Sequence, residues 1–484
     1  MRHVADAGLP RPTTSPLFCL PIALGLALAI ACHGVSAQPC EPYWSDDFPS
    51  ADLAVGLVFA LTSFDDGSGD GAALYIGGHL PTAGEVAINN IAKFEGNSWS
   101  PLGSGLNSGV WALTGFDDGS GSGLALFAGG AFSWAGDVSV NSIAKWDGET
   151  WSPLGSGMVG PVTALAVFDD GLGGGPALYA GGNFITAGGV RANSIAKWDG
   201  DSWSPLVKGI DGIVYAMTVF DDGSGSGPAL YVGGHFTTAG GAIVNDIAKW
   251  DGLTWSPVAS GIDGGSLWAL AVFDDGNGAA LYAGGSFTSA GGVSANNIAR
   301  WDGSTWSPVG GGTDNGVLVL AAFDNTPGSG PALYAGGDFS TAGGVTAYHV
   351  AKWDGSSWSP LGGGLDRSVR VLAVLDDASE DAGLYAGGFF WKTGDQVSAV
   401  HFAKWDGTDW AGVGGGLSGW VTALISTDLG SNGRPDLYVG GFFTRAGNIA
   451  AGSIAKWDGQ TWSRLGSGVE KNAGAGSVRT LAVL

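Results

Sequence analysis

A pair of aromatic residues recurs eight times along the chain, and this repetition restricts the fold more than any other feature. Successive copies lie 51 or 52 residues apart, and the clearest one reads Ile143-Ala-Lys-Trp-Asp-Gly-Glu-Thr-Trp151-Ser-Pro-Leu. The first aromatic residues are Phe94, Trp146, Trp198, Trp250, Trp301, Trp353, Trp405 and Trp457, and the second are Trp99, Trp151, Trp203, Trp255, Trp306, Trp358, Trp410 and Trp462. A unit repeated at this period seldom buries its apolar faces alone, so the fold must come from packing between neighbouring units.

Each unit contains four segments with the composition of β-strands, which we denote a to d. In the copy that we take as the type, they are Val162–Phe168, Ala177–Gly182, Ser194–Trp198 and Trp203–Leu206. Segments a and b are apolar runs closed by glycines, and Asp199-Gly200 is a hairpin signal between c and d. Pro205 cannot donate a ladder hydrogen bond, which suits segment d as an outer edge strand.

The four segments and the lack of helical periodicity predict an all-β fold, an eight-bladed β-propeller of four-stranded antiparallel blades with tryptophans between the blades. An open solenoid is the alternative. Segment a occurs nine times, from Val58–Phe64 to Val478–Leu484, whereas segments b, c and d occur eight times. The surplus copy favours a ring: it either competes with the first copy to close the ring or begins a ninth unit.

The repeat resembles the kelch motif in its apolar run that ends in Gly-Gly, followed by an aromatic residue, a tryptophan and Pro-Leu. The phrase Asn-x-Ile-Ala-Lys-Trp-Asp-Gly is also similar to repeats of fungal cortical polarity-marker proteins. The resemblance covers roughly residues 55–484, with a period close to the kelch value of about 50. It departs from the motif in the shorter spacing of the aromatic pair. It implies a propeller used mostly for binding, and it supplies no catalytic residue.

The amino terminus has the pattern of a secretory signal peptide. Arg2 and Arg11 precede an apolar run from Leu17 to Ala31, and residues 35–37, Val-Ser-Ala, form a small-residue cleavage site. This run is shorter than the roughly 20 apolar residues that a membrane-spanning helix needs. We therefore expect export, with no membrane insertion after cleavage.

The expected organisation is a signal peptide at residues 1–37, a short linker at 38–54 and the repeat domain at 55–484. The expected location is secreted, cell-surface or periplasmic, and a lipoprotein modified at Cys32 is the alternative. After cleavage Cys40 is the one remaining cysteine, so no intrachain disulfide can form. We expect a monomer that packing alone holds together.

The chain is strongly acidic, with a net charge of −24 that becomes −25 without the leader, and such a charge repels nucleic acid. In a propeller the a–b loops and c–d turns emerge on one face, and 29 of the 44 acidic residues fall there. We expect Asp-Asp-Gly in the a–b loops to be a solvated turn. The cations at the register of Lys145 are expected to pair with turn aspartates or to cover tryptophan.

The segment Asp428–Asp436 spaces its oxygens as a calcium loop does, which leaves calcium-dependent adhesion as an alternative function.

No catalytic residue can be assigned from the sequence. Once the leader is removed, a hydrolase would have to use His79, His235, His349 or His401, and we expect a structural role for each. The sequence has no metal-ligand spacing such as His-x-x-x-His or paired cysteines, and we expect no cofactor. An extracellular carbohydrate-active enzyme with its site over the central channel is the alternative.

A binding site on a nearly symmetric ring must break the symmetry, so differences between copies locate it. The residue after the Gly-Gly of segment b varies. Nearby d–a loops contain Arg367, Arg370 and Trp420, and Trp134 and Trp391 interrupt b–c loops. The candidate ligand-binding residues are His79, His235, Asp338, Arg367, Trp391 and Trp420. Aromatic residues beside polar groups suit recognition of glycans or peptides, although neutral variation of surface loops would give the same pattern. The sequence thus predicts an exported, non-catalytic recognition or scaffold propeller that binds an extracellular glycan or protein through this face.

Overall fold

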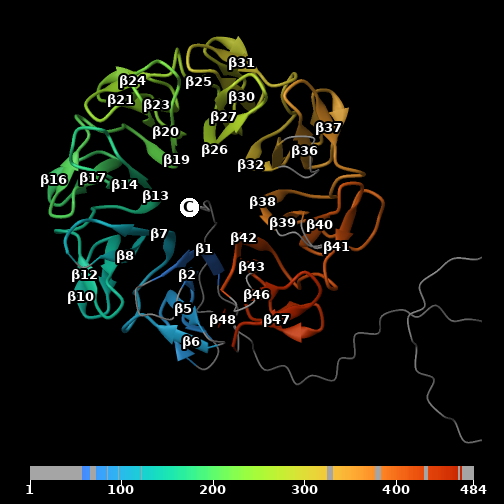
Figure 1. The fold of residues 1–484 in the computed structure, drawn as a ribbon, viewed down its shortest axis with the longest axis horizontal. Coiled ribbons are helices and arrows are strands. Elements are labelled where there is room, and N and C mark those ends of the chain that lie inside the picture. Colours follow the sequence, from blue (N-terminus) through green and yellow to red (C-terminus); the bar gives the residue numbers. More distant parts are fainter. Residues whose placement is uncertain are drawn as a thin grey trace, which may run out of the picture. The chain divides into compact units, whose positions relative to one another are not determined.

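The computed structural model describes residues 57–65, 72–83, 86–95, 98–121, 123–323, 331–375, 383–429, 434–466 and 469–470. Residues Asp52–Leu484 form one compact unit, and the secondary structure described in it consists of β-strands. In the described residues, eight four-stranded antiparallel sheets surround a central opening (Figure 1). The prediction of an all-β propeller with four-stranded blades is confirmed. The predicted signal peptide and linker lie outside the described residues and stay predictions.

The four strands have these bounds in blades 1 to 8. Strand a is β1 (Leu57–Phe64), β7 (Val110–Asp117), β13 (Val162–Phe168), β19 (Ile213–Phe220), β26 (Ser266–Asp274), β32 (Val317–Phe323), β38 (Val369–Leu375) and β42 (Val421–Thr427). Strand b is β2 (Ala73–His79), β8 (Leu124–Gly130), β14 (Ala177–Gly182), β20 (Ala229–His235), β27 (Ala279–Ser286), β33 (Ala332–Gly337), β39 (Gly383–Gly388) and β43 (Asp436–Gly441). Strand c is β5 (Ile91–Glu95), β11 (Ile143–Trp146), β17 (Ile195–Trp198), β23 (Ile247–Trp250), β30 (Ile298–Trp301), β36 (Val350–Trp353), β40 (Phe402–Trp405) and β46 (Ile454–Trp457). Strand d is β6 (Ser98–Pro101), β12 (Trp151–Pro153), β18 (Trp203–Pro205), β24 (Trp255–Pro257), β31 (Trp306–Pro308), β37 (Trp358–Pro360), β41 (Trp410–Gly412) and β47 (Trp462–Arg464).

Within each blade the strands pair in the order a, b, c, d, with strand a nearest the central opening and strand d at the outer edge (Figure 1). In the type copy, β13 and β14 have the bounds that were predicted for strands a and b. Strand c starts one residue later than predicted because Ser194 has a φ of +66°, a left-handed conformation that does not fit a ladder. Pro205 ends the outer strand, where its missing N–H leaves no ladder position empty.

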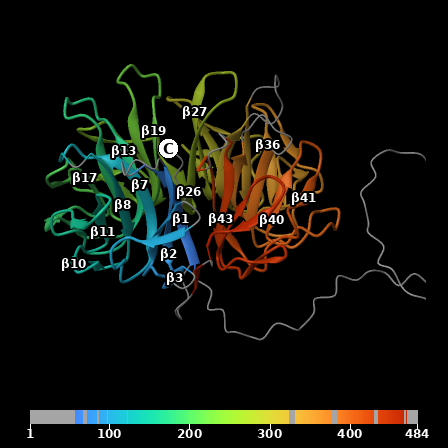
Figure 2. The ribbon, with the colours of Figure 1, turned by 60° about the horizontal axis from the view of Figure 1, so that its bottom comes forward.

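Blade 1 packs against blade 8 and closes the ring (Figure 1, Figure 2). Val58 of β1 shares a hydrophobic cluster with Ala423 of β42. Beyond the last d strand, β48 (Val469–Glu470) pairs with β3 (Thr82–Ala83) of blade 1. An open solenoid would leave these surfaces apart, so that alternative is wrong. The first copy of segment a supplies the inner strand of blade 1, and the surplus copy, Val478–Leu484, lies outside the described residues.

In seven of the eight blades, the second tryptophan of the pair donates a hydrogen bond to the preceding blade; Trp410 of blade 7 is buried without such a bond. Trp151 Nε1 donates a hydrogen bond to the carbonyl oxygen of Leu102 at 2.7 Å, and Trp99 donates to Leu465 across the closure. The equivalent donors elsewhere are Trp203, Trp255, Trp306, Trp358 and Trp462. Among the described residues the core consists of eight clusters, each between two blades and each containing tryptophan. The predicted placement of the tryptophans between blades is confirmed.

The b–c loops contain small hairpins that the sequence reasoning did not predict. The part of the chain that the structure describes has seven of them: β3 with β4 (Val86–Ala87), β9 (Trp134–Ala135) with β10 (Val138–Ser139), β15 (Thr186–Ala187) with β16 (Val190–Arg191), β21 (Thr238–Ala239) with β22 (Ala242–Ile243), β28 (Ser289–Ala290) with β29 (Val293–Ser294), β34 (Thr341–Ala342) with β35 (Val345–Thr346), and β44 (Arg445–Ala446) with β45 (Ile449–Ala450). The d–a segment of the preceding blade pairs with the hairpin, as β25 (Ile262–Asp263) does with β28. Gly240 has a φ of +62°, and a Cβ there would lie 2.8 Å from Trp255 Cδ1. Glycine therefore allows the hairpin to lie against the tryptophan.

Every inner strand has a β-bulge near its start. In blade 2 the pairing register shifts between Val110 and Ala112, which leaves Trp111 without a partner on strand b. The bulge residues of blades 1 to 8 are Phe59, Trp111, Thr163, Tyr215, Trp268, Leu318, Arg370 and Thr422. A bulge redirects the side chain of the extra residue. The ring thus carries one redirected side chain per blade at its inner edge, where the d–a segments enter strand a.

Candidate functional site

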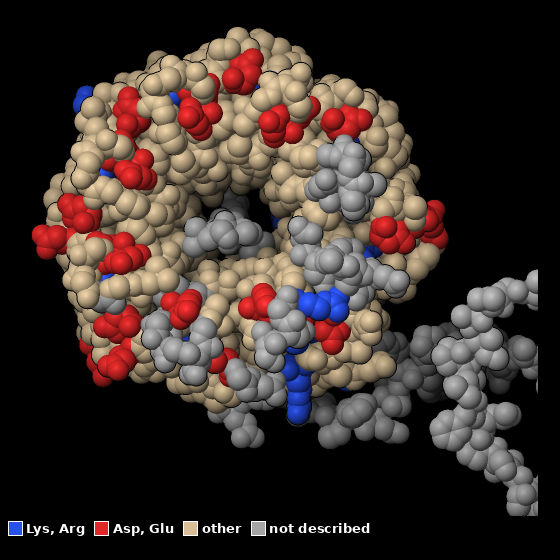
Figure 3. Space-filling view, viewed as in Figure 1, with Lys and Arg blue, Asp and Glu red and all other residues tan. Residues whose placement is uncertain are grey.

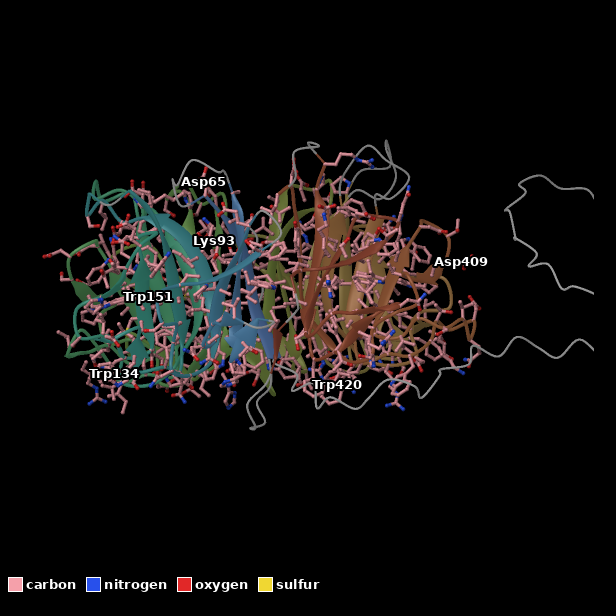
Figure 4. All side chains as sticks on the ribbon, turned by 90° about the horizontal axis from the view of Figure 1, so that it is seen from below. Asp65, Lys93, Trp134, Trp151, Asp409 and Trp420 are labelled. Carbon is pink, nitrogen blue, oxygen red and sulfur yellow. The ribbon has the colours of Figure 1, made fainter. Side chains whose placement is uncertain are left out.

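The two faces of the ring differ in chemistry. Figure 4 shows Asp65, from an a–b loop, on one face, and Trp134 and Trp420, from a b–c loop and a d–a segment, on the opposite face. We call the face of the a–b loops and c–d turns the acidic face, and the face of the b–c and d–a loops the aromatic face. Figure 3 looks onto the acidic face and shows aspartate and glutamate side chains spread around the ring. Acidic residues therefore lie on the face where the sequence predicted them.

The paired aspartates of the a–b loops have two different roles. Asp117 is exposed, and its Oδ1 accepts a hydrogen bond from the backbone N–H of Gly119 at 3.0 Å, as expected for a solvated turn. Asp118 is buried; it accepts hydrogen bonds from Lys145 Nζ at 2.6 Å and from Trp198 Nε1 of the next blade at 3.2 Å. The expectation of a solvated turn is wrong for the second aspartate, because that carboxylate pairs with the register cation and ties two blades together.

The same ion pair recurs around the ring. It joins Lys197 to Asp170, Lys249 to Asp222, Arg300 to Asp275, and Lys456 to Asp436. Burial acts to raise the pKa of Asp222, but hydrogen bonds from Lys249 and Ser224 lower it to about 2. These carboxylates are used in holding the blades, so the acidic face is in large part structural.

The segment proposed as a calcium loop has one of its carboxylates already paired. Asp436 is buried and accepts a hydrogen bond from Lys456 Nζ at 2.7 Å. Residues 430–433 of this loop lie outside the described residues. In the described ranges of the chain, no group of three or more His, Cys, Asp or Glu side chains could hold a metal ion. The described residues therefore give calcium-dependent adhesion no support.

On the aromatic face, two variable sets of residues meet at the inner edge of the ring. We call the inner rim the eight bulge residues together with the eight residues that follow the Gly-Gly of strand b. The latter are His79, Ala131, Asn183, His235, Ser286, Asp338, Phe389 and Phe442. The two sets touch: the rings of Phe59 and His79 have centroids 5.4 Å apart, and the Arg370 guanidinium lies 4.6 Å from the centroid of Phe389. The backbone around these positions repeats from blade to blade, whereas the side chains differ.

Blades 6 to 8 bring together an aromatic and charged group, which we call the rim cluster: Asp338, Arg370, Phe389, Trp420 and Phe442. Trp420 immediately precedes strand a of blade 8, and its ring centroid lies 4.8 Å from that of Phe389 and 5.9 Å from that of Phe442. Arg370 stacks on Phe389, and its Nη2 lies 3.9 Å from Asp338 Oδ1. The Trp420 residue is still 48% exposed. The rim cluster thus presents an accessible indole beside a guanidinium.

Two other predicted residues, Arg367 and Trp391, lie around the buried His401 of blade 7. The rings of Trp391 and His401 have centroids 5.5 Å apart. Burial lowers the pKa of His401, and the charge of Arg367 acts in the same direction. Asp366 fixes this loop, because its Oδ1 accepts the backbone N–H of Trp391 at 2.7 Å. Trp391 is largely exposed, so it extends the aromatic surface of blade 7.

The two predicted histidines of the inner rim lie elsewhere, in blades 1 and 4. His79 packs edge-on against Phe59, and burial lowers its pKa. His235 Nδ1 lies 3.2 Å from the carbonyl oxygen of Gly265 and 3.6 Å from Asp246 Oδ1. Neither histidine is part of the rim cluster, to which Asp338 and Trp420 belong. His235 lies in blade 4, away from blades 6 to 8, whereas His79 lies in blade 1, which packs against blade 8.

Sequence reasoning missed the bulge residues. It placed Arg370 in a d–a loop, whereas this residue is the bulge of β38 and part of the innermost strand. It gave no role to Trp111, Tyr215 or Trp268, which occupy the same position. A signal was present, because this position varies between aromatic, aliphatic, hydroxyl and charged residues while the valine or leucine before it is nearly constant.

Comparison with known proteins gives loose likenesses in structure. Neither a protein-family model nor a curated protein matches the chain. The extracellular domain of a hybrid two-component system from B. thetaiotaomicron is 11% identical with a TM-score of 0.38; the match covers 86% of this chain and 53%, about half, of that chain. BBS1N in complex with ARL6DN is 12% identical with a TM-score of 0.32, and the match covers 69% of this chain and 92% of that chain. The GH74 xyloglucanase from Xanthomonas campestris is 12% identical with a TM-score of 0.28, and the match covers 85% of this chain and 93% of that chain. Likenesses this loose do not bear on function.

In the part of the chain that the structure describes, no helix is long and apolar enough to cross a membrane.

Proposed function

We propose that this chain is an exported, non-catalytic recognition or surface-scaffold module with a kelch-like propeller at residues 55–484. It binds an extracellular glycan or protein through the inner rim of the aromatic face. Signal-directed export by residues 1–37 and action as a monomer outside the cytoplasm are parts of the same proposal. The resemblance of the repeat to the kelch motif supports it, since that motif implies a propeller used mostly for binding.

The rim cluster is the observation that carries this proposal. A recognition site on a ring of similar blades needs a sector that differs from the others, and the rim cluster is such a sector. In blades 2, 3 and 5 the residue after Gly-Gly is Ala131, Asn183 or Ser286, whereas blades 7 and 8 place phenylalanines on either side of Trp420. Exposed aromatic groups that neighbouring rings hold in place contribute strongly to binding because little conformational entropy is lost.

The inner rim is poor in groups for hydrolysis, which supports a non-catalytic role. Glycoside hydrolysis uses a pair of carboxylates on either side of the scissile bond. Of the sixteen rim positions, all of them within the described residues, one carries an acid: Asp338, which faces Arg370. A second carboxylate, Asp246, lies beside the rim residue His235, but in blade 4, whereas Asp338 lies in blade 6. The alternative, a carbohydrate-active enzyme with its site over the central channel, therefore has no pair of carboxylates within one blade among the described residues of this rim.

The chain offers a matched control for the binding test. Trp134 lies on the aromatic face in blade 2 and, like Trp420, is 48% exposed. We expect the double variant Trp391→Ala with Trp420→Ala to bind its ligand at least about tenfold more weakly, which corresponds to about 1.4 kcal/mol. Trp134→Ala should bind like the unmodified protein. The measurement is the affinity for a panel of immobilised glycans and purified secreted proteins.

Undiminished binding by the double variant would place the recognition surface elsewhere on the molecule. Release of soluble products from a polysaccharide panel by the unmodified protein would contradict the non-catalytic role.

A further inference from the structure

We propose that the ligand of the rim cluster is an acidic polysaccharide, whose sugar rings stack on Trp420 and whose carboxylate or sulfate groups pair with Arg370 and Arg367. This inference rests on the proposed function of the same rim and narrows it to one class of ligand. Three features of the described residues support it: the local charge, the stacked guanidinium and the interrupted edge of the inner strand.

Cations gather beside the rim cluster although the chain as a whole carries a net charge of −24. In the described bulges, b–c loops and d–a segments there are six cations, and four of them, Arg367, Arg370, Lys392 and Arg445, lie between residues 366 and 450. In the same stretch these loops hold two acids, Asp366 and Asp395, so the cations outnumber them, and Asp366 accepts backbone N–H groups of the b–c loop. This sector of the aromatic face is therefore the part suited to an anion.

Repulsion from the acidic face does not prevent such binding. The Debye length is about 8 Å at physiological ionic strength, so charges on the far side of the ring are screened, while a contact at the rim is not. The local charge decides which ligand groups can approach.

The guanidinium of Arg370 is held in a position that suits a carboxylate or sulfate. It stacks on Phe389, which leaves the N–H groups at its edge available for pairing with an anion. Its present partner, Asp338, is 3.9 Å away, and both side chains are more than a third exposed, so the pair is loose and can exchange. Trp420 also lies against Phe389, with ring centroids 4.8 Å apart. One ligand can thus contact an indole and a guanidinium at the same time.

Recognition by side chains favours a polysaccharide over an extended peptide. A peptide that adds to a sheet needs a regular edge of free N–H and C=O groups. The inner strands of blades 7 and 8 are interrupted at the rim by the bulges at Arg370 and Thr422, which break that edge. The faces of pyranose rings carry C–H groups that pack on an aromatic plane and need no backbone ladder.

The experiment measures binding of the full chain to defined polymers at physiological salt. The probes are polygalacturonate, which carries carboxylates, dextran sulfate, which carries sulfates, neutral dextran, and poly-glutamate as an acidic peptide. We expect binding to one or both acidic polysaccharides that is at least tenfold tighter than binding to dextran or poly-glutamate. The comparison of polygalacturonate with dextran sulfate identifies which anionic group is recognised.

The variants separate a specific site from general attraction. Arg370→Gln should weaken binding at least tenfold, and Arg370→Lys should restore part of it because the charge returns without the stacked plane. Arg367→Gln tests a second, exposed position. Arg191→Gln on blade 3 is the matched control and should bind like the unmodified protein. Thermal unfolding of each variant checks that it is folded.

The outcomes distinguish this inference from the proposed function. Tight binding to dextran that Trp420→Ala abolishes and Arg370→Gln leaves unchanged would overturn the acidic ligand but keep the rim as the binding site. Equal binding to poly-glutamate would overturn the choice of a polysaccharide. No binding to any probe by the unmodified chain, with no effect of either substitution on any other ligand, would overturn both proposals.

Discussion

Asp246 of blade 4 occupies a position that is an asparagine in blades 1 and 5. There the amide side chain both accepts a hydrogen bond from the backbone and donates one to it. Asn90 accepts the backbone N–H of Leu80 at 2.9 Å through Oδ1 and donates from Nδ2 to the carbonyl oxygen of Leu106 at 2.6 Å. Asp246 Oδ1 accepts the N–H of Phe236 at 2.7 Å, but an ionised carboxylate has no hydrogen to donate to the equivalent carbonyl oxygen. Burial raises the pKa of Asp246 to about 6.

We expect Asp246→Asn to stabilise the protein at neutral pH. The pKa of the folded carboxyl, about 6, lies above the value of about 3.9 in the unfolded chain, so the folded state binds more protons between these values. The free energy of unfolding therefore falls as the pH rises from about 4 to about 6 and stays low above that range. The variant should lack this decline and gain on the order of 1–3 kcal/mol at pH 7. Urea unfolding across this pH range measures it.

Asn297→Asp is the reverse control for that prediction. Asn297 accepts the N–H of Phe287 and donates to the carbonyl oxygen of Thr313, so the substitution creates the situation of Asp246 in blade 5. It should lower the stability at pH 7 and add a pH dependence of the same sign. If neither substitution changes the pH dependence, the shift does not arise from this position.

The sequence could not reveal the conformation at this position. His349 and His401 occupy it in blades 6 and 7, and the sequence suggested polar residues within a strand. Their φ values are +71° and +61°, so they belong to a left-handed turn before strand c. Asparagine, serine, aspartate and histidine all occur at this position, because what the blades share there is the left-handed backbone conformation and not one type of side chain.

At the level of the element, Asp118 tests whether the a–b loops hold blades together. We expect Asp118→Ala to lower the free energy of unfolding by about 2–4 kcal/mol, because it leaves the ammonium of Lys145 buried without its partner and removes the acceptor of Trp198. The neighbouring Asp117→Ala removes an exposed turn cap and should cost less than about 1 kcal/mol. Chemical denaturation of both variants measures the difference, and equal costs would contradict the role assigned to the second aspartate.

The regular strands were predictable, and the small elements between them were not. Apolar runs closed by Gly-Gly or Asp-Gly identify β13 and β14 to the residue, because side-chain composition and turn chemistry agree there. The b–c hairpins consist of two-residue strands, too short for any periodicity in the sequence, and they depend on pairing with the preceding blade. The bulges depend on how strand a is aligned with strand b, which composition does not encode.

The same distinction explains which site residues were found. Trp420 and Asp338 stood out as departures from the repeat, and the structure places both in the rim cluster. His79 and His235 departed equally but are not part of it: His235 lies in blade 4, and His79 packs on Phe59 in blade 1, next to blade 8. Differences between copies indicate where symmetry breaks, but distances across the ring come only from the closed fold.

For the whole molecule, the two ends of the repeat region must meet, and Trp99 tests this. Trp99 Nε1 of blade 1 donates a hydrogen bond to the carbonyl oxygen of Leu465, which follows the last strand of blade 8. Trp255 Nε1 makes the equivalent bond to Leu206 between blades 4 and 3, which are consecutive in the sequence. We expect Trp99→Phe and Trp255→Phe to destabilise by similar amounts, about 1–3 kcal/mol, from the lost hydrogen bond and the smaller ring. Thermal and urea unfolding measure both. A neutral Trp99→Phe beside a costly Trp255→Phe would mean that the ring is open in solution.

The bulge in each inner strand has a consequence for how such a protein can change over time. The register of strands a and b skips the bulge residue, so Thr163 in one blade and Trp268 in another occupy the same position on the backbone. New specificity could therefore arise by exchanging single residues at exposed bulge positions such as Arg370. Thr163 and Thr422, by contrast, donate side-chain hydrogen bonds to the carbonyl oxygens of Val214 and Val58 in the next blade, so exchange there would also affect how the blades pack. Each exposed bulge position can thus vary independently of the corresponding positions in the other blades.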